Sequence, residues 1–187
     1  MNQFGNRGLG DYGARLGLGP AVFWLLLANV AVFLLQMVSR GVAGGRDPIA
    51  EWFAFVPYLA INELQIWRFF TYMFLHAHFW HIALNMLGLW LFGSRIEAHW
   101  GTRTFTWYYL ASGIGGGLLY GIFSLSGLDA FGYMLGASGA VYGLLLAFGL
   151  AFPNAIIFML FIPMPARIAV IVFGVISLLG IGGEGIA

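Results

Sequence analysis

The sequence PAVFWLLLANVAVFLLQMV, residues 20–38, decides the fold class of this chain. It contains no charged residue, and a helix of about 20 apolar residues can cross the roughly 30 Å hydrocarbon core of a bilayer. Pro20 stands at a favourable first position for such a helix. No small-residue cleavage site follows the run, so we interpret it as a retained membrane helix rather than a removable signal peptide.

The composition of the whole chain agrees with a lipid environment. Of the 187 residues, 61% are hydrophobic and only 8% are charged, whereas a soluble domain carries about a quarter charged residues. This charge is too sparse to cover a water-facing surface. The formal net charge of +1 argues against a nucleic-acid partner, which would need a dense basic patch. The absence of cysteine excludes a disulfide framework, a thiolate metal site and a cysteine nucleophile.

Apolar segments of near-membrane length recur along the chain, so we expect one all-α domain over residues 1–187, a polytopic bundle of five membrane helices. The predicted helices cover residues 20–38, 79–95, 104–125, 138–152 and 166–181. Residues 1–19 would form a cytoplasmic N-terminal tail. Residues 39–74, which are rich in aromatic side chains, would form an interfacial loop between the first two helices. In that loop, Trp67-Arg68 would anchor the chain at the headgroup level.

The distribution of arginine favours a cytoplasmic N-terminus. With that orientation the inner segments hold five arginines and the long outer loop holds three, which is a modest positive-inside bias. The inner set is Arg7, Arg15, Arg95, Arg103 and Arg167, and the outer set is Arg40, Arg46 and Arg68. The second and fourth helices then both begin at the outer face, at a similar depth. We expect an integral, multi-pass protein of the bacterial inner (plasma) membrane.

Gly136-Ala137-Ser138-Gly139 places a serine between glycines where the fourth helix begins. The glycines allow a tight turn, and the free N–H groups at a helix start can stabilise a developing oxyanion. The fourth helix is also too short to span the hydrocarbon core, so we expect Ser138 to lie below the outer surface and to face a water-filled cavity. The alternative is that these small residues only let helices pack closely.

Polar side chains also mark the second helix. His81 and Asn85 are four residues apart and share one face, and such groups inside a membrane usually face the bundle interior. They are donors of the kind that an oxyanion hole needs, or they form an interhelical hydrogen bond that holds the fold. His76 and His78 would line a wet interface or support His81. A metal site is not favoured, because no His-Glu-x-x-His motif, cysteine or nearby intramembrane carboxylate accompanies them.

Together these residues resemble the rhomboid family of intramembrane serine proteases, from about residue 20 to the C-terminus. The matching residues are Trp67-Arg68, His81 to Asn85, Gly93 to Glu97, Gly136 to Gly139, and Tyr142. The resemblance implies that Ser138 is the nucleophile and that His81 and Asn85 are oxyanion-hole donors. It implies that Tyr142, one turn after Ser138, packs against the catalytic histidine; on spacing alone, a packed aromatic is the better explanation of Tyr142. Gly136, Gly139, Tyr142 and His76 are the supporting residues of the predicted site.

The chain departs from the family pattern in one respect. The family's general base is a histidine on a sixth helix, and no histidine follows His99 here. A serine hydroxyl is a poor nucleophile without an adjacent base, so we expect little or no hydrolysis by the chain as given. We interpret it as a C-terminally truncated protease; the alternative is an inactive rhomboid-like pseudoprotease that binds transmembrane helices. Without a sixth helix we also expect a poorly stable bundle whose Gly139/Gly143 face is exposed to lipid.

The partners implied by this interpretation are transmembrane protein substrates and the lipid bilayer. No cofactor, metal or nucleic acid is implied, and the oligomeric state stays open. A small transporter is disfavoured, because no charged residue lies in the middle of a predicted helix and no inverted repeat of broken helices is present.

Overall fold

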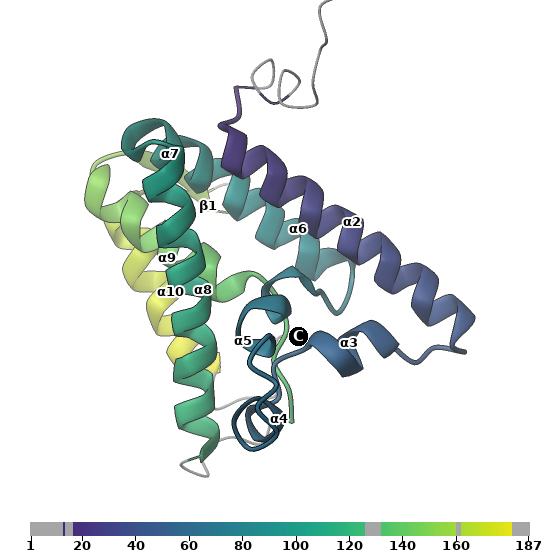
Figure 1. The fold of residues 1–187 in the computed structure, drawn as a ribbon. Helices are drawn as coiled ribbons and strands as arrows, with labels where there is room; N and C mark the ends of the chain where they lie inside the picture. Colours follow the sequence, from purple (N-terminus) through teal and green to yellow (C-terminus); the bar gives the residue numbers. More distant parts are fainter. Residues whose placement is uncertain (1–12, 14–16, 126–131, 160–161, 181–187) are drawn as a thin grey trace, which may run out of the picture.

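The computed structural model describes residues 13, 17–125, 132–159 and 162–180. Most of the predicted N-terminal tail over residues 1–19, and the C-terminal residues 181–187, therefore lie outside the described part of the chain. The described residues are mostly helical, and α9 (Ser138–Ala151) lies among the other long helices (Figure 1).

The first long helix, α2 (Pro20–Val42), begins where predicted and continues past residue 38. It ends where Gly44 and Gly45 adopt positive φ angles of 65° and 96°, a backbone conformation that glycine enters without a steric penalty. Among the described residues, it is the one helix that is long and apolar enough to cross a membrane by length and composition. The helix over Ser138–Ala151 is apolar but shorter.

The N-terminus of α2 is capped by a carboxylate from a distant segment. Glu97 accepts hydrogen bonds from the backbone N–H groups of Ala21 and Val22, both at 2.9 Å, and from the hydroxyl of Thr102 at 2.8 Å. The first N–H groups of a helix have no partner within it, and a negative charge there also interacts favourably with the helix dipole. Glu97 is 3% exposed, so it joins its own helix, α7, to the N-terminal ends of α2 and α8.

The connector after α2 contains four short helical segments: α3 (Pro48–Phe53), α4 (Pro57–Ile61), α5 (Arg68–Thr71) and the 3₁₀ turn η1 (Tyr72–Phe74). Arg68, which we expected to anchor the connector together with Trp67, is buried within the protein and only 2% exposed. Its guanidinium donates to the carbonyl oxygens of Ala54 (2.5 Å) and Glu51 (2.9 Å) and to Oε1 of Gln65 (2.7 Å). Buried irregular backbone needs such donors, so Arg68 supports the connector from inside.

The second predicted helix is a continuous helical run of three parts: α6 (Phe79–Gly88), the π-helical turn η2 (Leu89–Gly93) and α7 (Ser94–Trp100). Gly101 follows with a φ of 79° and allows the sharp turn into α8 (Thr102–Leu125). These bounds, and those of α9, lie close to the sequence predictions.

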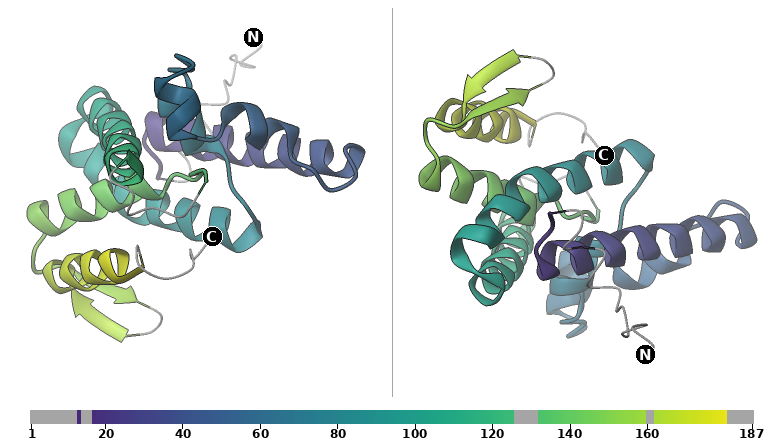
Figure 2. Two further views of the ribbon diagram at one scale, coloured as in Figure 1. Left: turned by 90° about the horizontal axis from the view of Figure 1, so that it is seen from below. Right: turned by 90° about the horizontal axis from the view of Figure 1, so that it is seen from above.

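The segment between α9 and the last helix differs from the all-α expectation. It forms an antiparallel hairpin of β1 (Ile156–Met159) and β2 (Ile162–Pro165), which stands beside α10 (Ala166–Gly180) at the edge of the bundle (Figure 2). Two prolines in β2 exclude a helix interior there. Each strand of a two-stranded sheet is an edge, where the missing N–H of proline is tolerated.

Helices α8 and α9 approach each other along small residues. A Cβ atom added to Gly116 would lie 3.3 Å from the Cα of Gly139, and one added to Gly143 would overlap Ser112. The hydroxyl of Tyr108 donates to the carbonyl oxygen of Gly143 at 2.8 Å. The expected exposure of the Gly139/Gly143 face is therefore wrong, because this face packs on α8.

We predict that Gly143→Ala destabilises the fold by about 1–3 kcal/mol, because its Cβ would overpack the contact with Ser112. Gly115→Ala is the matched control, since a Cβ at Gly115 meets nothing within 4 Å and alanine favours a helix by up to about 1 kcal/mol. The free energy of unfolding of each variant, measured in detergent micelles, gives the effect of each substitution. Equal effects of the two changes would contradict this packing.

Candidate functional site

Ser138 is the first residue of α9, and its position is set by the preceding loop. In that loop Met134 pairs with Phe55 of the connector through two backbone hydrogen bonds of 2.8 and 2.9 Å. Two residues further on, the N–H of Gly136 donates to the carbonyl oxygen of Tyr72 at 2.9 Å. The serine is thus held by hydrogen bonds to segments far away in the sequence.

The structure brings Ser138 together with His81. Oγ of Ser138 lies 3.5 Å from Nε2 of His81, which belongs to the first turn of α6. Gly136 makes this approach possible: its φ is 115°, and a Cβ there would lie 2.5 Å from Nε2 of His81. The glycine of the predicted motif therefore serves the site through both its conformation and its lack of a side chain.

Asn85 lies one turn below His81 on the same helix and is 6% exposed. Its amide Nδ2 donates to the carbonyl oxygen of His81 at 3.0 Å, so one N–H of the amide is engaged by the backbone of α6. An asparagine amide carries a second N–H donor, for which no hydrogen bond is described.

His76 and His78 contact His81 in different ways. The ring of His76 is fully buried, with its centroid 5.1 Å from that of His81 in an edge-on arrangement; its two ring nitrogens have no hydrogen-bond partner within the described residues. His78 is exposed, and its Nδ1 accepts from the N–H of His81 at 3.2 Å, which caps α6. The described residues contain no group of three or more histidines and acids arranged to hold a metal ion.

The other supporting residues divide between packing and the site. Gly139 faces Gly116 of α8 rather than His81. Tyr142 lies one turn after Ser138 on α9 and is 43% exposed. On the same side of α9, Leu146 and Leu150 are 47% and 75% exposed. Ser138 therefore lies at the N-terminal end of an exposed apolar stripe on this helix.

The sequence reasoning missed Tyr72, whose hydroxyl donates to the carbonyl oxygen of Gly113 at 2.6 Å while its own carbonyl oxygen receives the N–H of Gly136. It also missed Gln36, a fully buried polar side chain in α2. The signal for Gln36 was available, because an amide within an otherwise apolar membrane helix usually has a specific partner.

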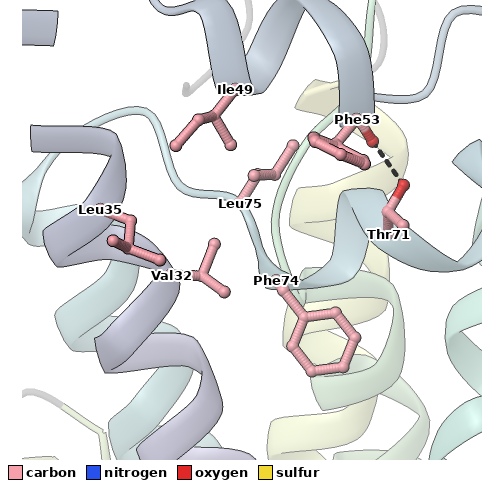
Figure 3. A pocket seen from close by; sticks show the side chains of 7 residues that line it. All are labelled: Val32, Leu35, Ile49, Phe53, Thr71, Phe74 and Leu75. Atoms are coloured by element: carbon pink, nitrogen blue, oxygen red, sulfur yellow. Dashed lines mark hydrogen bonds between the residues drawn. The ribbon is translucent and has the colours of Figure 1, made fainter. Parts of the chain in front are cut away.

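An apolar hollow of about 310 Å³ lies between α2, α3 and η1, apart from Ser138 (Figure 3). It is lined by Val32, Leu35, Ile49, Phe53, Thr71, Phe74 and Leu75. The hydroxyl of Thr71, its one polar side-chain group, donates to the carbonyl oxygen of Phe53 at 2.7 Å. The hollow therefore offers no reactive group.

Comparison with known proteins gives one consistent result. A family model described as the Rhomboid domain matches residues 63–187. "Rhomboid protein 1, mitochondrial" of Saccharomyces cerevisiae is 40% identical over 148 residues, which cover 77% of this chain and 40% of that protein. "Rhomboid protease GlpG" of Yersinia pestis is 29% identical over 131 residues, or 70% of this chain and 43% of the relative. "RHOMBOID-like protein 1" of Arabidopsis thaliana is 38% identical over 87 residues, which cover 46% of this chain and 21% of that protein. The chain spans less than half the length of these relatives.

We predict that Gly136→Ala displaces His81 from Ser138 and destabilises the fold by about 1–3 kcal/mol, because alanine is strained at this φ and its Cβ meets the imidazole. Gly132→Ala, in the same loop, is the control, since a Cβ at Gly132 meets nothing within 4 Å. Nitrogen chemical shifts of the His81 ring and the unfolding free energy report the two effects. An unchanged His81 spectrum in Gly136→Ala would contradict the assigned contact.

Burial in the apolar interior, together with the neighbouring His81, lowers the pKa of His76 from 6.5 to about 3. Between these two values the unfolded chain binds a proton at this position and the folded chain does not, so stability falls as pH falls from 6.5 toward 3. We predict that His76→Asn reduces this loss of stability. Unfolding free energies measured at pH 7 and at pH 5 test the prediction, and an identical pH dependence in both proteins would refute it.

Proposed function

Because this chain belongs to the rhomboid family, we propose that its function lies in the reaction of the Ser138 hydroxyl with a peptide bond inside the membrane. The chain is then part of an intramembrane serine endopeptidase. The observation that carries this proposal is the 3.5 Å approach of Ser138 Oγ to Nε2 of His81, at the start of a helix whose first N–H groups have no partner within the helix.

The reaction is acyl transfer. Oγ of Ser138 attacks the scissile carbonyl carbon, and the carbonyl oxygen becomes an oxyanion. His81 through Nε2–H, Asn85 through its second amide N–H, and the backbone N–H of Ser138 stabilise this charge. The amine leaves with a proton, and water then hydrolyses the acyl-enzyme. The 3.5 Å distance between Ser138 and His81 is long for a hydrogen bond. Hydrogen bonds between catalytic groups are often long before substrate binds and shorten in the complex.

The proton of Ser138 needs an acceptor. The resemblance to the family assigns this role to a histidine on a sixth helix, and the 187 residues hold no histidine after His99. Our proposal therefore assigns the nucleophile and the oxyanion-hole donors to residues of this chain and assigns the base to none of them.

The family places the protein in a membrane as an integral protein. We further propose five membrane helices in this chain, formed by α2, by α6 with η2 and α7, and by α8, α9 and α10, with a cytoplasmic N-terminus in a bacterial inner membrane. Ser138 and His81 then lie toward the outer face. The substrates are transmembrane segments of other proteins, which enter from the lipid and are cleaved near the outer interface.

A second candidate function is binding of transmembrane helices without cleavage, as in an inactive rhomboid-like protein. The observation that favours it is the exposed apolar side of α9, where Leu146 and Leu150 are 47% and 75% exposed, because a transmembrane helix could pack on such a surface. The two functions differ in their product: the protease releases two fragments, whereas the binding protein holds an intact helix.

The experiment is expression of the gene, with any coding sequence that follows residue 187, beside a reporter that has one transmembrane segment. We predict that Ser138→Ala abolishes cleavage and that Asn85→Ala lowers its rate about 10²- to 10³-fold, as does loss of other oxyanion-hole donors. Ser124→Ala, on α8, is the control for loss of a serine. Cleavage that survives Ser138→Ala would refute the nucleophile assignment; an intact but co-purifying reporter would favour the binding protein.

A further inference from the structure

Two polar side chains near the outer end of α2 converge on the turn that precedes α6. Oε1 of Gln36 accepts the backbone N–H of His76 at 3.0 Å. The guanidinium of Arg40 donates to the carbonyl oxygens of Ala77 (2.7 Å) and His76 (3.0 Å). The backbone of this turn is therefore held by α2 at three polar atoms, although it is separated from α2 by the whole connector.

Asp47 locks the two α2 side chains in place. Its Oδ2 accepts from Nε2 of Gln36 at 2.8 Å and from Nη2 of Arg40 at 2.6 Å, while its Oδ1 accepts the N–H of Ala50 and caps α3. Burial acts to raise the pKa of Asp47, but the bonds from Ala50, Arg40 and Gln36 outweigh it and lower the pKa below 3.8. The carboxylate thus stays charged, and both donors keep their orientation.

The turn leads directly to the candidate site through His76. Its ring is fully buried against the ring of His81, and its nitrogens find no polar partner in the part of the chain that the structure describes. The direction of this ring therefore depends on how its backbone is held and on how it packs. The His81 ring in turn lies next to Ser138, with its Nε2 3.5 Å from Oγ of the serine.

We propose that Gln36 and Arg40 are positioning residues of the site: by holding the backbone of His76 and Ala77 against α2, they direct the His76 ring, which sets His81 against Ser138. The proposal rests on the proposed function, because it assigns these residues a part in aligning an oxyanion-hole donor. It makes the outer end of α2 part of the catalytic scaffold, although neither Gln36 nor Arg40 reaches the substrate.

The connector supplies a matched control. Arg46, like Arg40, forms an ion pair with an acid of the connector, donating to Glu51 at 3.0 Å. Its side chain is 74% exposed, whereas that of Arg40 is 26% exposed. No hydrogen bond described for Arg46 reaches the histidine turn. Arg40→Met and Arg46→Met thus each remove one positive charge and one ion pair to an acid of the connector, and only the first releases the turn.

The test compares these two variants with Arg40→Lys and Gln36→Met in the full-length protein. Two properties are measured: nitrogen chemical shifts of the His81 ring, and kcat and KM for a transmembrane reporter. We expect Arg40→Met to change the His81 shifts and to lower kcat about 10- to 100-fold, the scale of a misplacement of about 1 Å, with KM nearly unchanged. Arg40→Lys, which keeps a donor, should recover part of kcat, and Arg46→Met should match the wild type.

Wild-type His81 shifts and kcat in Arg40→Met would overturn the proposal. So would an equal loss of kcat in Arg46→Met, because the effect would then come from a loosened connector. If Arg40→Met does not fold, Gln36→Met decides by the same criteria. If the wild type cleaves no reporter, the proposed function fails, whereas the His81 shifts still show whether the α2 contacts position the ring.

Discussion

The close approach of α8 and α9 at Gly116 and Gly139 is the constraint on which the rest of the structure depends. A side chain at either glycine would meet the other helix or the hydroxyl of Tyr72. Tyr72 fills the space beside this contact, donates to Gly113, and offers its own carbonyl oxygen to Gly136. The packing of two helices through small residues thereby holds the connector, and the connector holds the loop that carries the serine.

Several polar side chains share a second property: they bind backbone groups at helix ends, in the connector or in turns. Glu97 caps the start of α2, Arg68 supports the carbonyl oxygens of the connector, and Gln36 with Arg40 holds the turn before α6. Where lipid replaces water, a free N–H or C=O costs several kcal/mol. These side chains are therefore found where helices begin, end or turn. The candidate site lies where the starts of α6 and α9 meet.

The sequence predicted the long helices well, because apolar runs of membrane length stand out from their polar ends. It also singled out His81, Asn85 and Ser138, since polar side chains in such runs are costly. It did not predict the β-hairpin, because proline indicates the end of a helix without indicating what replaces it. It predicted that Arg68 anchors the connector at the headgroup level. An arginine in an aromatic-rich loop is typical both of an interfacial anchor and of a buried hydrogen-bond donor, so the sequence does not separate the two.

By itself, then, the sequence determined the helical class, the approximate bounds of the long helices and the candidate side chains of the site, because periodicity and polarity are local properties. Only the tertiary structure decided which of these groups meet. The 3.5 Å contact of Ser138 with His81 depends on hydrogen bonds from Phe55 and Tyr72 to the serine loop. Those bonds join residues far apart in the chain. Which residues become partners depends on how the whole protein packs, and a local sequence pattern does not contain that information.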